Sequence, residues 1–112
     1  MAKKLIKIVL LAVVTIALTI QPPAIAAELA NGAQIFTVQC AGCHPNGGNI
    51  IRWWKPLKKG ALKRNHLETL EAIAAYVARG KNPMPAYRDR LNDKELEDVS
   101  AYVLQQAERG WK

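Results

Sequence analysis

The sequence has few aromatic residues and no long basic run. Aromatic side chains make up 6% of the 112 residues. A chain of this length forms at most one small domain, which excludes a multidomain enzyme. Its formal net charge is +7, but without a basic run or a nucleic-acid motif we expect no binding to nucleic acid. The hydrophobic core of so small a domain gives only marginal stability by packing alone. We therefore expect a metal, disulfide or cofactor to supplement it.

The long apolar run is too short to span a bilayer. It covers the 13 residues Ile8 to Ile20, follows three lysines and ends before two prolines, whereas a spanning helix needs about 20 residues. This pattern predicts a signal peptide over residues 1–26, cleaved after Ala26, with cleavage after Ala27 as the alternative. The mature domain would be residues 27–112, with a net charge of +4 and no membrane anchor.

Apolar residues recur at helical spacing, and no segment alternates as a strand does, so we expect an all-α fold of three to four helices. The expected helices are 29–40, 65–79 and 93–108, with a shorter helical turn at 56–63. Asn92 and Glu95 form a capping box at the start of the last one, and Gly80 is a fitting stop for the second. Gly32, on the apolar face of the first, predicts a close crossing by another helix.

Two long connections, 45–55 and 81–91, are rich in proline, glycine and asparagine. Irregular loops of this length rarely persist in a compact domain unless they wrap a ligand or carry function. We therefore expect both loops to border a binding site.

The first loop follows the segment Cys40-Ala41-Gly42-Cys43-His44, which is the C-x-x-C-H attachment pattern of a c-type haem. Cys40 and Cys43 could each add to one vinyl group of a porphyrin, and His44 could present its imidazole to the iron. Two alternatives remain open: a dithiol redox pair or local disulfide, and a zinc site completed by His66.

The second loop contains Met84, the one methionine of the mature chain, held between Pro83 and Pro85. Because prolines restrict the backbone on both sides, this thioether is preorganised to ligate an iron. Iron held by His44 and Met84 has no open position, which favours electron transfer over catalysis. The alternative is a haem-based ligand sensor or peroxidase-like enzyme in which Met84 dissociates.

The chain resembles the class I c-type cytochromes, and within them the cytochrome c6 family of cyanobacteria and algae. The resemblance covers nearly the whole mature chain. It is carried by these segments: Ala27 to Gly32, Ile35-Phe36, Cys40 to His44, Gly47 to Asn49, Leu57 to Lys59, Gly80 to Ala86, Leu91, Asp98-Val99, Ala101 to Leu104, and Gly110-Trp111.

The resemblance implies one covalently attached haem c in a crevice, with Gly32 and Phe36 of the first helix against Tyr102 of the last. It also implies a monomeric electron carrier, not an enzyme, in the thylakoid lumen or periplasm. Such a carrier takes electrons from the cytochrome b6f complex to photosystem I or a terminal oxidase. It would touch these membrane complexes transiently, docking on acidic protein surfaces.

Three departures from the family pattern indicate a divergent, c6B- or c6C-type member. Tyr76 stands where the family has a glutamine close to the ring, and losing that amide is expected to lower the potential. Pro45 follows His44 where a small residue is commoner. Arg52-Trp53-Trp54 replaces a smaller, more polar stretch, and we expect one tryptophan to line the crevice and the other to cover the loop.

Three smaller expectations concern the surroundings of the haem. Some of Lys55, Lys58 and Lys59 could meet a haem propionate or an acidic partner. His66 is expected to begin the second helix as a surface or capping residue. The imidazole N–H of His44, on the side away from the metal, should donate to a carbonyl in the 45–56 loop.

Overall fold

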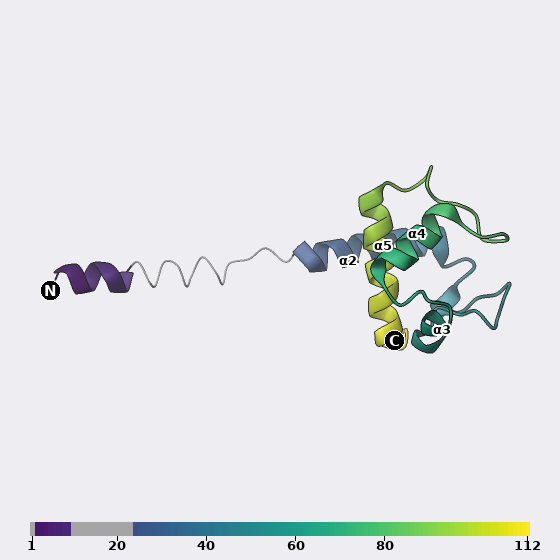
Figure 1. Ribbon diagram of the computed structural model, residues 1–112, viewed down its shortest axis with the longest axis horizontal. Helices are drawn as coiled ribbons and strands as arrows, with labels where there is room; N and C mark the ends of the chain where they lie inside the picture. The colour runs from purple at the N-terminus through teal and green to yellow at the C-terminus, as the bar shows by residue number, and fades with distance from the viewer. Residues whose placement is uncertain (1, 10–23) are drawn as a thin grey trace.

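The computed structural model describes residues 2–9 and 24–112 of the chain (Figure 1). Most of the apolar run of the predicted signal peptide lies outside the described residues. Residues 2–9 are helical. No helix within 2–9 and 24–112 is long and apolar enough to cross a bilayer.

The described chain is helical, which confirms the all-α prediction. In chain order its elements are α2 (Ala24–Ile35), a π-helical turn η1 (Phe36–Cys40), a 3-10 turn η2 (Pro45–Gly47), α3 (Lys59–Arg64), α4 (Leu70–Arg79) and α5 (Asp93–Glu108). In these same residues extended pairing is limited to one isolated bridge between Lys81 and Met84. The first helix was expected to start at Leu29, but it starts earlier, at Ala24.

Helices α2 and α5 cross at the centre of the domain (Figure 1). A Cβ atom added to Gly32 would overlap the main-chain carbonyl of Asp98 and press on the Cβ of Tyr102. The rings of Phe36 and Tyr102 lie 5.5 Å apart, centroid to centroid. The close crossing expected at Gly32 is therefore confirmed.

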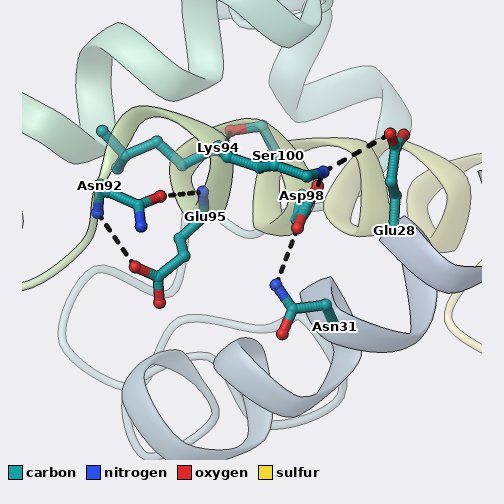
Figure 2. A network of polar contacts seen from close by, with 8 residues as sticks. Glu28, Asn31, Asn92, Lys94, Glu95, Asp98 and Ser100 are labelled. Carbon is teal, nitrogen blue, oxygen red and sulfur yellow. Dashed lines mark hydrogen bonds and ion pairs between the residues drawn. The ribbon is translucent and has the colours of Figure 1, made fainter.

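Polar contacts fix the start of α5 and join it to α2 (Figure 2). The predicted capping box is present, since Asn92 Oδ1 accepts from the backbone N–H of Glu95 and the Glu95 carboxylate accepts from that of Asn92. Asp98 is buried, and its carboxylate accepts from Asn31 Nδ2 at 2.7 Å and from Lys94 Nζ at 3.1 Å. A buried carboxylate needs such partners, and the contact with Asn31 joins α2 to α5.

Helix α4 begins at Leu70 rather than at Asn65, so the predicted boundary is wrong. Thr69 is the N-cap, and its hydroxyl accepts from the backbone N–H of Ala72 at 3.1 Å. Asn65 instead ends α3, whose six residues lie slightly later than the helical turn expected there. His66 has a positive φ of 56° between the two helices, so it does not begin a helix.

Trp111, one residue before the end of the sequence, completes the core. Its indole is buried against Phe36, with ring centroids 5.1 Å apart, and edge-on to Tyr102 at 6.2 Å. Its Nε1–H donates to the carbonyl of Leu57 at 2.9 Å. A Cβ on Gly47, whose φ is +74°, would run into this indole, so only glycine allows the ring to lie there.

Candidate cofactor site

A cavity of about 500 Å³ lies between η1, α4 and the two long loops. Cys40, Cys43, His44 and Met84 all line it, although they come from segments some forty residues apart. Its apolar wall includes Phe36, Leu57, Leu62, Leu67, Ile73, Val77, Val99 and Val103. This volume is within the range of ordinary cofactor pockets, about 300–1,000 Å³. Both loops border the cavity, which confirms the expectation drawn from their length.

A widened helical turn presents the two cysteines. The backbone of η1 bonds from Ala41 N–H to Phe36 O at 2.8 Å, a spacing of five residues in place of four. The chain then tightens, because the N–H groups of Cys43 and His44 both donate to Cys40 O, at 3.2 and 2.9 Å. The π turn was missed from the sequence, where apolar spacing does not distinguish it from an α-helix.

The two cysteines lie in different surroundings: Cys40 is half-buried and Cys43 is exposed. Burial, and to a smaller extent the neighbouring Cys43, raises the pKa of the Cys40 thiol to about 11. Redox-active dithiols depend instead on a thiolate stabilised near neutral pH. This environment therefore weighs against the dithiol redox alternative.

The His44 ring is held by one nitrogen. Its Nδ1 lies 2.8 Å from the carbonyl oxygen of Gly48, and because a carbonyl only accepts, Nδ1 carries the proton. The other nitrogen, Nε2, then keeps its lone pair for a metal. The expected carbonyl in the 45–56 loop is present, and the structure identifies it as that of Gly48.

Met84 is positioned by a tight turn after α4. Gly80 ends the helix with a φ of 65°, and its N–H donates to Tyr76 O. Lys81 and Met84 then exchange two backbone hydrogen bonds of 3.1 and 2.8 Å. Further along this loop, the Tyr87 hydroxyl donates to the carbonyl of Gln39 at 2.9 Å. The loop is thereby tied to the residue before Cys40.

The chemistry of this donor set fits a c-type haem. Two thiols, a tautomerically fixed imidazole and a thioether line one apolar cavity, and four cationic side chains line it as well: Arg52, Lys55, Arg79 and Lys81. These cations are suited to the two carboxylates of a haem. His66 also lines the cavity, yet no three His, Cys, Asp or Glu side chains of the described chain are grouped to hold a metal ion. The zinc alternative finds no support in that part of the chain.

The prediction for the tryptophan pair is wrong, since neither Trp53 nor Trp54 lines the cavity. Both are exposed, at 79% and 53%, and their rings meet edge to face at 5.8 Å. Tyr76, in contrast, does line the cavity. Sequence reasoning gave no role to the side chain of Arg52, which lines the cavity and donates to the carbonyl of Asn82 at 3.3 Å.

Comparison with known proteins gives consistent results. Residues 27–103 match the family model described as cytochrome C oxidase, cbb3-type, subunit III. The chain is 53% identical over 110 residues to a cytochrome c6-like protein of Nostoc sp. (strain PCC 7120 / SAG 25.82 / UTEX 2576), covering 98% of this chain and 99% of the relative.

Two solved structures are similar as well. The structure of cytochrome c6C from Synechococcus sp. PCC 7002 is 53% identical with a TM-score of 0.69, covering 70% of this chain and 96% of that one. That of cytochrome c6B from Synechococcus sp. WH8102 is 44% identical with a TM-score of 0.70, covering 73% and 93%.

Proposed function

The chain belongs to the cytochrome c6 family of class I c-type cytochromes and carries one covalently attached haem c, and we propose that it is a one-electron carrier rather than an enzyme. The haem supplies an iron that changes oxidation state by one electron. Cys40 and Cys43 form the two thioether bonds to it, and His44 and Met84 are its proximal and distal ligands.

One observation carries this proposal: a single apolar cavity is lined by all four residues, with His44 Nδ1 already engaged by Gly48 O at 2.8 Å. That contact fixes the ring and leaves Nε2 for the iron. If Met84 is the second ligand, His44 and Met84 together would leave substrate no access to the iron. A haem held in this way would supply one-electron chemistry with little rearrangement of these residues.

Membership of the family supports a proposal for the cellular role. We assign residues 1–26 to a cleaved signal peptide and residues 27–112 to the cytochrome domain, exported to the thylakoid lumen or periplasm as a monomer. The carrier accepts electrons from the cytochrome b6f complex and delivers them to photosystem I or a terminal oxidase. Acidic surfaces on these partners complement its basic charge.

Absorption spectroscopy of the mature protein from a host proficient in cytochrome assembly tests the proposal. A pyridine haemochrome spectrum of the c type, with a mass increase of one haem, is expected. The oxidised protein should show the far-red sulfur-to-iron charge-transfer band, and the reduced protein should not bind carbon monoxide. Carbon monoxide binding without that band would indicate a ligand sensor or enzyme with a dissociable Met84. A colourless protein would contradict haem attachment itself.

A further inference from the structure

The loop before α3 exposes an unusual concentration of large apolar side chains. Ile50 is 65% exposed, and Trp53 and Trp54 are 79% and 53% exposed. Ile51, 53% exposed, lies beside them but also borders the cofactor cavity. Because neither tryptophan lines the cofactor cavity, a haem in that cavity leaves both indoles at the surface. Large apolar side chains gathered on a surface mark an interaction site.

This loop is organised by Asn49. The Asn49 side-chain oxygen accepts from the backbone N–H groups of Ile51 and Arg52, at 3.1 and 2.8 Å, and its Nδ2 donates to the carbonyl of Lys55 at 3.1 Å. A further bond joins Lys55 N–H to Arg52 O at 2.8 Å. The two tryptophans between these residues are thus presented outward by a fixed backbone, which lowers the ordering cost of binding.

The same stretch of chain is uniformly basic. No aspartate or glutamate occurs between Glu28 and Glu68, whereas six basic residues do: Arg52 and Lys55, which line the cofactor cavity, and Lys58, Lys59, Lys63 and Arg64, which do not. Within the described chain, one of these six forms an ion pair, Lys59 with Glu108 at 2.9 Å. Lys63 and Arg64 are exposed at the end of α3, which adjoins the loop at the edge of the domain (Figure 1).

We propose that residues 50–64, comprising the tryptophan loop and α3, bind reversibly to the surface of an anionic lipid bilayer. Tryptophan is the side chain most characteristic of the membrane interface, where its apolar ring meets the acyl boundary and its N–H meets water and headgroups. Basic residues beside it are drawn to anionic headgroups. Residues 50–64 combine basic side chains with exposed indoles and contain no acidic residue. This is the composition of segments that anchor proteins at the membrane interface.

This surface is a property of the polypeptide and goes beyond the proposed electron transfer. A bilayer fits it better than a protein partner because the apolar residues project from a loop, and the cations extend over the whole segment. Peripheral attachment would confine the protein to two dimensions, which shortens its search for membrane-embedded complexes. It would be lost in high salt, where headgroup attraction is screened.

Vesicle flotation of the mature holoprotein tests the proposal. We expect the protein to float with vesicles of phosphatidylcholine and phosphatidylglycerol at low salt, and not with phosphatidylcholine alone. The double substitution Trp53→Ser/Trp54→Ser should reduce partitioning at least about tenfold, because it removes two large apolar side chains from the contact. An unchanged haem spectrum in the variant would show that the fold and the redox centre are intact.

Two single substitutions distinguish an effect of the basic segment from an effect of the overall net charge. Lys63→Ala, within the segment, should weaken binding and reduce its salt dependence, whereas Arg88→Ala, an exposed charge outside it, should not. The proposal is overturned if the wild-type protein stays unbound at low salt, or if the double tryptophan variant floats as well as wild type. It is also overturned if the tryptophan variant keeps its vesicle binding and loses only its exchange of electrons with a protein partner.

Discussion

The α-carbon of Gly32 lies directly against the main-chain carbonyl of Asp98, so that a methyl group on it would overlap that oxygen. The two helices that meet there carry other contacts that depend on the same approach. Asn31 donates to the Asp98 carboxylate at 2.7 Å, and Phe36 contacts Tyr102 one turn further along. Close packing of the backbones at one point thus supports a buried polar contact and an aromatic contact on either side of it.

Gly32→Ala is expected to destabilise the protein. The backbone carbonyl cannot move aside as a flexible side chain would, so the helices must separate, at a cost of about 1–3 kcal/mol. Urea unfolding followed by circular dichroism measures the change in free energy.

Gly60→Ala is the matched control for that substitution. Its added Cβ would meet only the flexible end of Arg64, at 3.4 Å, and alanine is the better helix former within α3. We expect unchanged or slightly higher stability. Equal losses in both variants would mean that the crossing at Gly32 has no special role.

Met84→Ala is expected to open the sixth position of the iron. The reduced variant should bind carbon monoxide, lose the far-red band and show a lower midpoint potential, by an amount on the order of 100 mV within the roughly 0.8 V that axial ligation covers. Met84→His is the control, because an imidazole would fill the position again and exclude carbon monoxide while keeping the potential low. An unchanged spectrum in Met84→Ala would assign the ligand to another residue.

Tyr76→Gln is expected to raise the potential. Tyr76 lines the cavity from α4, at the position where the family resemblance implies a glutamine, whose amide could donate a hydrogen bond to the ring. One added hydrogen bond is worth about 1 kcal/mol, which for one electron is a rise of about 40 mV. Spectroelectrochemical titration of both proteins checks the value. Tyr76→Phe should leave the potential nearly unchanged, and no rise in the glutamine variant would remove the explanation for this departure.

Tyr87→Phe is expected to alter the alkaline stability of the protein. Burial raises the pKa of the Tyr87 phenol above its ordinary 10.0, so the native state holds this proton more tightly than the unfolded chain. The stabilisation is complete below pH 10.0 and is lost as the pH rises through the folded-state pKa. The variant also loses the hydrogen bond to Gln39 O, which costs about 1 kcal/mol at neutral pH.

The difference in stability between wild type and Tyr87→Phe should therefore shrink as the pH is raised above 10. Denaturant titrations at neutral and alkaline pH measure it. A gap that stays constant across this range would show that the phenol does not ionise differently in the two states.

Local chemistry explains which parts of the fold were predictable. The start of α5 was predicted to the residue because Asn92 and Glu95 satisfy each other's backbone groups within one turn. The start of α4 was missed because Leu67 packs against the core from outside any helix, and its spacing from Leu70 and Ile73 mimics a helical stripe. Helical spacing shows which residues are buried, but not which element buries them.

The candidate site was likewise predictable in part. Cys40, Cys43 and His44 are adjacent in sequence, and the proline-flanked Met84 is chemically distinctive, so all four could be selected before the cavity was known. The directions of Trp53 and Trp54 depend on three hydrogen bonds made by Asn49, which composition does not encode. The choice of Gly48 as the partner of His44 likewise depends on the loop conformation.

The indole of Trp111 links the surroundings of the haem to a residue distant in sequence. Its ring packs against Phe36, which lines the cofactor cavity, and against Gly47, which lies three residues after His44. A smaller side chain at position 111 would leave that space open to water. The haem environment therefore depends on a residue about seventy positions after the cysteines that attach the haem.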